Sequence, residues 1–272
     1  MNKHLAMMPP LIALVKAAGD KILSTYNDQS TIEVHSKADN SPVTEADLAA
    51  NECLLAGLSV IDAGAMIVSE EADIPDYSIR QQWSRYWLID PLDGTQEFIA
   101  GSGEFTVNLA LIEKGVPILG LVYQPVTNTL YVGMAGQGAF CYRDGTKTAI
   151  FARSMGSQIK RGLPLVAVTS RRHGLEKLDG FLKNSPVAVQ PRAVGSSLKL
   201  CLIAAGEADI YPRFGPTSEW DTAAAQAIVE AAGGHVLDMG WRPLRYNQKA
   251  SLLNPEFIVI GSDPDLAKET FG

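Results

Sequence analysis

The sequence is poor in cysteine and in positive charge, and each shortage excludes a class of protein. Only three cysteines occur among 272 residues, far apart and among apolar neighbours. An odd number in this setting does not fit a disulfide framework and favours the cytoplasm. Lysine and arginine number 23 against 30 acidic residues, a net charge of −7, which argues against binding a nucleic-acid polymer. A phosphorylated small-molecule substrate would then need a local cationic site or a metal.

Long hydrophobic runs are also missing. No uninterrupted apolar segment approaches the ~20 residues of a membrane-spanning helix. The N-terminal segment lacks the long apolar region and cleavage site of a signal peptide. We therefore expect no transmembrane segment, while a peripheral contact with the inner membrane stays open. The chain, 46% hydrophobic and without an evident linker, is long enough for a large core.

Hydrophobic periodicity changes character near residue 150. Before that point we expect two amphipathic helices, a short strand at 31–35, an apolar strand near 65–71 and an antiparallel meander with short turns. The helices span 9–27 and 48–61, the meander strands 105–112, 117–123 and 129–135. The Gly-rich run 133–138 could be a phosphate loop, but no helix follows it, so we interpret it as a hairpin.

From residue 160 onward, strands alternate with helical segments, which is typical of an α/β arrangement. The strands are expected at 165–170, 187–189 and 208–213, the helices at 175–182, 196–206 and 222–232. The predicted fold class is therefore α/β with an α+β N-terminal half. We place an α+β subdomain at residues 1–150 and an α/β subdomain at 151–272.

The segment Trp87–Thr95 carries the strongest chemical signal. Its apolar run ends in two carboxylates, Asp90 and Asp93, on a turn with Pro91 and Gly94. Carboxylates three residues apart across a tight turn can converge on a hard cation, for which oxygen ligands suit Mg²⁺. The Gly94 N–H can approach an anion closely, and Thr95 adds a hydroxyl. An ordinary surface turn has the same composition, so this alternative stays open here.

Acidic residues at two other element ends repeat this pattern. The apolar strand 65–69 leads into Glu70 and Glu71, and Asp221 stands at the start of the alanine-rich helix at 222–232. Ligand sites in sheet proteins cluster at strand ends, and a carboxylate at a helix start is held rigidly. Solvated loop acids and a plain N-cap are the alternatives.

Two further segments have both a capping and a functional interpretation. Thr44 and Asp47 have the spacing of a capping box. Ser196 and Ser197 stand at the predicted start of a helix, where free N–H groups favour an anion. Capping explains these serines equally well, but it does not explain Lys199, a cation placed against the helix dipole.

The motifs together resemble those of the lithium-sensitive, Mg²⁺-dependent phosphatase superfamily that includes inositol monophosphatase and fructose-1,6-bisphosphatase. The matching segments are 87–95, Val43–Asp47 and Trp220–Ala224 followed by Ala-Gly-Gly. The resemblance implies a layered αβαβα sandwich and two or three Mg²⁺ ions. It also implies that Asp47 bonds Thr95 to help activate water, with Glu70 positioning that water. The implied metal ligands are Glu70, Asp90, the Leu92 carbonyl, Asp93 and Asp221.

Within the superfamily the chain resembles the 3′(2′),5′-bisphosphate nucleotidases of the bacterial CysQ type. This resemblance rests on segments 85–99, 103–108, 195–199 and 211–221. It implies hydrolysis of 3′-phosphoadenosine 5′-phosphate to AMP and phosphate, without a phosphoenzyme. Ser196, Lys199, Arg213 and His173 would bind the second phosphate, so the full substrate-binding set is Asp93, Gly94, Thr95, His173, Ser196, Lys199, Arg213 and Asp221. Arg172 stands where the family has a small residue beside His173. The alternative for His173 is an ordinary loop imidazole without a role in binding.

Two other functions stay open from the sequence. An inositol monophosphatase would not require the basic pair Lys199 and Arg213, and a nucleotide-binding protein without turnover would be expected to lack a ligand or Thr95. Neither loss is present. The sequence leaves open whether the protein is a monomer or a homodimer, and whether the substrate is 3′-phosphoadenosine 5′-phosphate, its sulfated precursor or an inositol phosphate.

Overall fold

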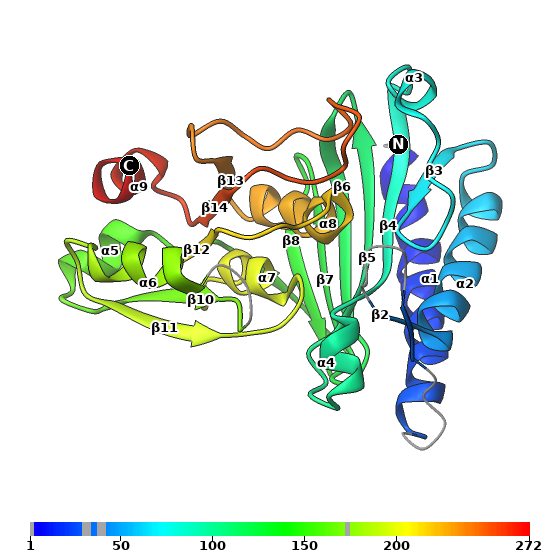
Figure 1. Cartoon of the computed structure of the whole chain (residues 1–272), viewed down its shortest axis with the longest axis horizontal. Helices are drawn as coiled ribbons and strands as arrows, with labels where there is room; N and C mark the ends of the chain where they lie inside the picture. The colour runs from blue at the N-terminus through cyan, green and yellow to red at the C-terminus, as the bar shows by residue number, and fades with distance from the viewer. Residues whose placement is uncertain (1–2, 29–33, 37–41, 172–174) are drawn as a thin grey trace.

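The computed structural model describes residues 3–28, 34–36, 42–171 and 175–272, which form five layers (Figure 1). Helices α1 (Lys3–Tyr26) and α2 (Glu45–Ile61) cover one face of a seven-stranded sheet. Helices α7 (Leu198–Ala204) and α8 (Glu219–Ala231) separate this sheet from a five-stranded one. The outer face of the second sheet is covered by α5 (Met155–Lys160), α6 (Leu175–Lys183) and α9 (Pro264–Phe271). The predicted αβαβα sandwich is confirmed.

The seven-stranded sheet is the predicted meander, extended at both edges. Its order follows the chain, β3-β4-β5-β6-β7-β8-β9, and only β3 and β4 are parallel. The strands are β3 (Met66–Ser69), β4 (Arg85–Asp93), β5 (Thr106–Glu113), β6 (Val116–Gln124), β7 (Thr129–Met134), β8 (Gly138–Arg143) and β9 (Thr146–Ile150). The Gly-rich run 133–138 is the β7–β8 hairpin, as predicted.

The five-stranded sheet is mixed and has the order β11-β10-β12-β14-β13. Strand β10 is parallel to β11 and β12, while β14 is antiparallel to β12 and β13. The strands are β10 (Leu165–Thr169), β11 (Val189–Ala193), β12 (Ile210–Arg213), β13 (His235–Asp238) and β14 (Phe257–Ile260). The last two strands and α9 lie beyond the segments for which the periodicity predicted elements.

Short elements complete the described chain. They are β1 (Val34–Ser36), β2 (Pro42–Thr44), α3 (Tyr77–Arg80) and α4 (Thr95–Ile99). Strand β1 pairs antiparallel with β2. Of the predicted strand at 31–35, residues 31–33 lie outside the described residues. No helix in the described part of the chain is long and apolar enough to cross a membrane.

Four predicted helix starts were wrong, and one of them is that of α2, which begins at Glu45 and not at Leu48. Helix α1 begins at Lys3, so Pro9 and Pro10 lie inside it. The prolines lack the N–H groups that would bond the carbonyls of Leu5 and Ala6, but both residues are exposed and water can take that role. Helix α7 begins only at Leu198, and Asp221 is the third residue of α8, whose N-cap is Ser218.

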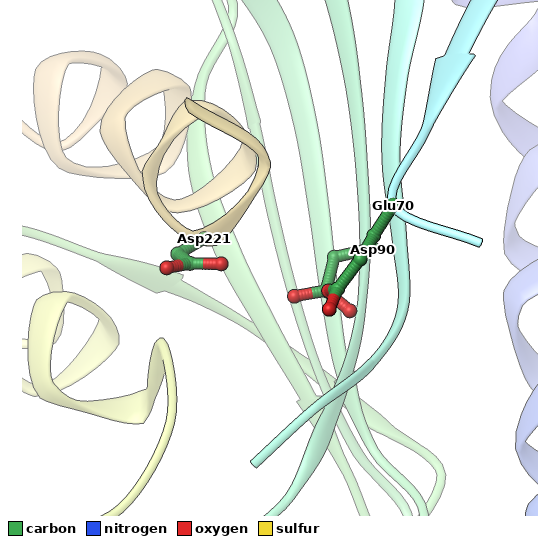
Figure 2. Close-up of side chains that lie close together, drawn as sticks. All are labelled: Glu70, Asp90 and Asp221. Atoms are coloured by element: carbon green, nitrogen blue, oxygen red, sulfur yellow. The ribbon is translucent and has the colours of Figure 1, made fainter. Parts of the chain in front are cut away.

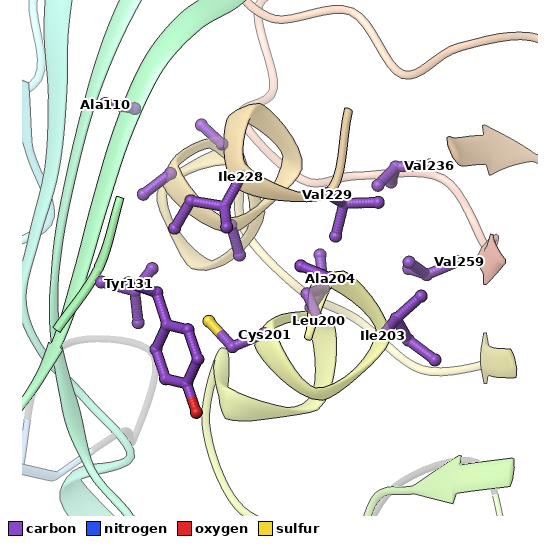
Figure 3. Close-up of a cluster of buried hydrophobic side chains, with 14 of the residues drawn as sticks. Ala110, Tyr131, Leu200, Cys201, Ile203, Ala204, Ile228, Val229, Val236 and Val259 are labelled. Atoms are coloured by element: carbon purple, nitrogen blue, oxygen red, sulfur yellow. The ribbon is translucent and has the colours of Figure 1, made fainter. Parts of the chain in front are cut away.

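Helix α8 belongs to the second half of the sequence but packs its backbone on the first sheet. A Cβ added at Gly120 of β6 would lie 2.0 Å from the Ala224 carbonyl oxygen. At Gly133 of β7 it would lie 2.4 Å from the Ile228 Cα. The two glycines thus leave room for the helix itself. Figure 3 shows Ile228 and Val229 of α8 beside Cys201 and Leu200 of α7 in the buried layer between the sheets.

We expect Gly120→Ala to lower the free energy of unfolding by about 1–3 kcal/mol or more, because the added methyl group meets backbone that has no free rotamer. Thermal or denaturant unfolding measures the change. Gly180→Ala is the matched control: Gly180 lies in α6 with nothing within 4 Å of an added Cβ, so this variant should be slightly more stable than wild type. Equal stability of the two variants would contradict this packing.

Candidate active site

Three carboxylates from separate elements converge at the junction of the two halves. Glu70 follows β3, Asp90 lies in β4, and Asp221 lies in the first turn of α8. One carboxylate oxygen of each lies within 4.8 Å of the others. Figure 2 shows the Glu70 and Asp90 side chains pointing toward the end of α8 that carries Asp221. The structure therefore brings together residues that the sequence places 20 and 131 positions apart.

Strand β4 carries a bulge that puts Asp90 and Asp93 on the same face of the sheet. Asp90 pairs with Asn108 of β5 and Asp93 with Thr106, so three steps on β4 face two on β5. Without the extra residue, side chains three apart would point to opposite faces. The sequence indicated a tight turn here. The structure shows that the strand continues through Asp93, and that the bulge re-aims the side chain.

Asp90 provides the strongest indication of a cation. Its side chain is 1% exposed, and Oδ1 accepts a hydrogen bond from the Leu92 N–H at 3.1 Å. The other oxygen, Oδ2, is buried and has no hydrogen-bond partner among the described residues. Burial, followed by the charges of Glu70, Asp93 and Asp221, raises the pKa of Asp90 well above its usual value. A buried carboxylate oxygen without a hydrogen-bond partner, beside other carboxylates, is unfavourable without a cation. The donor set consists only of oxygens, which fits a hard cation such as Mg²⁺.

Asp93 is held by residues from both halves of the chain. Its Oδ2 accepts hydrogen bonds from the Ser197 N–H and, at 3.4 Å, from the Asn108 side-chain amide. Burial raises the pKa of Asp93 to about 6, against the opposing effect of Lys199 and the Ser197 N–H. Burial also lowers the pKa of Lys199 to about 8, while the Asp93 charge acts to raise it. Asp93 and Lys199 thus partly compensate each other's charge inside the protein.

Asp47 makes both of the contacts that the sequence left as alternatives, a cap of α2 and a hydrogen bond with Thr95. Its Oδ2 accepts from the Thr44 N–H at 2.8 Å and from the Thr44 hydroxyl at 2.6 Å, which caps α2. Its Oδ1 accepts from the Thr95 hydroxyl at 3.2 Å. Thr95 Oγ1 also lies 3.3 Å from the Leu92 carbonyl oxygen. One buried carboxylate therefore fixes the start of α2 and the hydroxyl beside the acidic cluster.

A cavity of about 240 Å³ contains most of the predicted site. Among its lining residues are Glu70, Asp93, Gly94, Thr95, Ser196, Lys199, Arg213 and Asp221. Asp90 and Leu92 are buried and are not among the lining residues. His173 lies outside the described residues.

The predicted cations face the same cavity as the acids, but their contacts differ from a plain helix-terminal anion site. Helix α7 has only seven residues, and the Ser197 N–H is already bonded to Asp93. The Lys199 ammonium donates to the Ser196 carbonyl at 2.5 Å. Arg213 donates through Nε and one terminal nitrogen to the carbonyls of Gly215 and Pro216. Lys199 and Arg213 are each less than one-tenth exposed, so their charges act inside the protein.

Sequence reasoning missed the polar network that joins the halves beside Asp93. The Ser197 hydroxyl lies 2.8 Å from the Thr106 hydroxyl and donates to the Asn108 side-chain oxygen at 2.9 Å. In the sequence, segment 103–108 contributes only to the resemblance to the nucleotidases. The signal was Thr106 and Asn108 at alternate positions on an otherwise apolar strand, where a buried polar side chain requires a partner.

An ion pair between a residue that lines the cavity and a neighbouring acid was also missed. Arg171 lines the cavity, and its guanidinium lies 2.6 Å from the Glu104 carboxylate. The same Glu104 oxygen accepts from the Gly195 N–H at 2.6 Å. Glu104, which lies just before β5, thereby holds the loop at Gly195 that leads into Ser196 and α7.

Comparison with known proteins gives consistent matches along almost the whole chain. The sequence model of the inositol monophosphatase family matches residues 6–264. A 3′(2′),5′-bisphosphate nucleotidase CysQ of Escherichia coli K12 is 46% identical over 253 residues, which are 93% of this chain and 99% of that protein. The crystal structure of CysQ from Bacteroides thetaiotaomicron has a TM-score of 0.75 and 40% identity, covering 94% of this chain and 97% of that one. The suhB protein of Bartonella henselae, 24% identical with a TM-score of 0.78 and 98% coverage of both chains, shares the fold.

We expect Mg²⁺ to raise the melting temperature strongly at pH 7.5 and little at pH 5. The pKa of Asp93 rises from 3.8 to about 6 on folding, and the pKa values of Asp90 and Asp221 also rise. The metal-free folded state therefore binds these protons more tightly, and loses stability as the pH rises from about 4 to 6. Mg²⁺ must displace the same protons, so its effect grows over this range.

Thermal denaturation with and without Mg²⁺ at several pH values measures this effect. Asp90→Asn should abolish most of the Mg²⁺ gain at pH 7.5. Glu52→Gln, the same change at an exposed acid on α2, should keep it. A Mg²⁺ gain that does not change between pH 5 and 7.5 would refute competition between protons and the metal.

Proposed function

The chain belongs to the inositol monophosphatase family, and on this basis we propose that it is a Mg²⁺-dependent 3′(2′),5′-bisphosphate nucleotidase. It converts 3′-phosphoadenosine 5′-phosphate to AMP and phosphate. One observation carries the choice of substrate: Lys199 and Arg213 line the same cavity as Glu70, Asp93 and Asp221. A single cavity thus offers an acidic metal site for one phosphate and a cationic site for another. The curated relatives are named 3′(2′),5′-bisphosphate nucleotidases, which supports a bisphosphate nucleotide as the substrate.

The acidic side of the cavity would hold two or three Mg²⁺ ions. The proposed ligands are Glu70, Asp90, the Leu92 carbonyl, Asp93 and Asp221. The orphaned Asp90 oxygen and the three convergent carboxylates support this assignment. Bound Mg²⁺ would lower the pKa of a water molecule and stabilise charge on the leaving oxygen. Binding of such a cation would relieve the mutual repulsion of these carboxylates without their protonation.

Asp47 and Thr95 orient the attacking water with Glu70. Asp47 accepts the Thr95 hydroxyl proton in its hydrogen bond, which leaves the Thr95 oxygen free to accept a hydrogen bond from water. The buried position of Asp47 fixes this orientation before substrate binds. Gly94 lines the cavity, and its backbone φ is 93°. Because glycine has no Cβ, a phosphate oxygen can approach the Gly94 N–H closely.

The cationic side recognises the phosphate that is not removed. Lys199 and Arg213, with the Ser196 hydroxyl and His173, are the proposed contacts for it. A phosphate bound to buried cations forms charge-assisted hydrogen bonds, and an analogue that lacks the phosphate leaves those cations unpaired. This difference explains a preference for a bisphosphate nucleotide over a monophosphorylated sugar.

The alternatives from the sequence are less well supported. Inositol monophosphatase activity does not require two buried cations opposite the acids, and the 46% identical relative is named as a nucleotidase. A binding protein without turnover would not need the Asp47–Thr95 pair, which is in place. The subdomain boundary near residue 150, the cytoplasmic location and the monomeric or dimeric state stay predictions.

We expect the wild-type protein with Mg²⁺ to hydrolyse 3′-phosphoadenosine 5′-phosphate far faster than inositol 1-phosphate. Arg213→Ala should lower kcat/KM for the nucleotide by about 10- to 100-fold, because a hydrogen bond to a charged group contributes about 1.5–3 kcal/mol. The rate on inositol 1-phosphate should change much less. Phosphate release measures both rates.

Arg192→Ala is the control for that experiment, because Arg192 is an exposed arginine on β11 outside the cavity. It should behave as wild type on both substrates. Equal wild-type rates on the two substrates would remove the second-phosphate site and leave a general phosphomonoesterase.

We further expect Asp47→Asn to lower kcat by about 10²- to 10⁴-fold with little change in KM, because the water loses its oriented hydroxyl. Thr44→Ala separates this effect from capping. It removes a hydroxyl that takes part in the cap of α2 and bonds Oδ2 of Asp47, not the oxygen that accepts from Thr95, so it should cost about 1 kcal/mol of stability and leave kcat near wild type. If both variants lose activity equally, Asp47 acts through α2 and not through Thr95.

A further inference from the structure

The first turn of α8, which carries Asp221, is held by a loop from near the C-terminus. Leu253 forms an isolated antiparallel bridge with Ser218. The Glu219 N–H donates to the Leu252 carbonyl and the Asn254 N–H to the Thr217 carbonyl, both at 2.8 Å. Residues 252–254 thus bind the chain immediately before and at the start of the helix.

Asn254 adds a side-chain contact on each side of Asp221. Its amide nitrogen donates to the Ser218 carbonyl at 2.7 Å and to the Thr222 hydroxyl at 3.0 Å, with Thr217 Oγ1 at 3.2 Å. An amide NH₂ has two hydrogens, so the two shortest contacts use both. Ser218 is the residue whose N–H binds the Asp221 carboxylate, at 2.8 Å. Asn254 therefore fixes both the residue that orients Asp221 and the residue that follows it.

The contact continues into the core through Thr222. Its hydroxyl lies 3.1 Å from the Tyr246 hydroxyl, which donates to the Gln226 side-chain oxygen at 2.7 Å. Thr222, Gln226 and Tyr246 are each at most 1% exposed. Alternative positions of the first turn would break bonds inside a fully buried chain of polar groups, which is costly.

We propose that Asn254 is a positioning residue for the metal site: its side-chain amide fixes the first turn of α8 and so the place of Asp221 relative to Glu70 and Asp90. A role of Asn254 in catalysis rests on the proposed function. Its effect on metal binding does not. Asp221 is the one member of the acidic cluster that reaches it from the second half of the chain. Its position therefore depends on contacts such as this one.

Removal of the amide should weaken Mg²⁺ binding more than it weakens catalysis at saturating metal. Outer partners of metal ligands typically contribute 10- to 100-fold in metal affinity, so Asn254→Ala should raise the Mg²⁺ dissociation constant by about this factor. Calorimetric titration of the metal-free protein with Mg²⁺ alone measures it. The Mg²⁺ concentration for half-maximal phosphate release should rise in parallel, while kcat at saturating Mg²⁺ returns to near the wild-type value.

Asn184→Ala is the matched control, because Asn184 is an exposed asparagine after α6 and should leave Mg²⁺ binding unchanged. An Asn254→Ala protein that is less stable but binds Mg²⁺ as wild type would overturn the proposal. If Asn254→Ala does not fold, Thr222→Val decides: a smaller but clear loss of Mg²⁺ affinity supports the proposal, and none overturns it. The titration uses no nucleotide, so an absence of nucleotide hydrolysis in the wild type would refute the proposed function separately.

Discussion

The repulsion between buried carboxylates is the constraint on which this structure depends. Glu70, Asp90 and Asp221 come within 4.8 Å of one another, and Asp90 is almost without solvent. Like charges at such distances are tolerated only if they are protonated or share a cation. The surrounding framework must therefore hold them against their own electrostatics. The cap of α8 and the C-terminal loop hold Asp221, and the β4 bulge aims Asp90 and Asp93 at the same face of the sheet.

Each half of the chain supplies only part of the site, so neither half contains the complete set of acids and cations. The first sheet supplies Glu70, Asp90 and Asp93, while α8 supplies Asp221 and the segments around α7 and β12 supply Lys199 and Arg213. Glycines on β6 and β7 let α8 lie directly against the sheet. The distance between Asp221 and the acids of the first sheet is therefore set by backbone-to-backbone packing, which adapts less than side-chain packing does.

Local patterns in the sequence predicted a large part of this arrangement. They did not predict the features that depend on contacts between segments far apart in the chain. Strand alternation gave the meander, and acids at strand ends gave Glu70 and Asp90, because both signals act over a few residues. The bulge at Pro91–Leu92 was not predicted, because it depends on the register with β5. Nor were the partners Asn108, Ser197 and Asn254, since each lies at least 15 residues from the group that it binds. The sequence offers Asp47 as a cap or as the partner of Thr95, and the structure shows that each of its two oxygens makes one of these contacts.

The placement of α8 has a consequence for how the protein is made. The last strand of the first sheet ends at Ile150, while the helix that covers its inner face ends only at Ala231. At a synthesis rate of 5–20 residues per second, the intervening segment of roughly 80 residues takes about 4–16 s to emerge from the ribosome. A first sheet that formed during this interval would lack the cover that α8 provides for its inner face. Stable formation of the first sheet is thus coupled to synthesis of the second half of the chain.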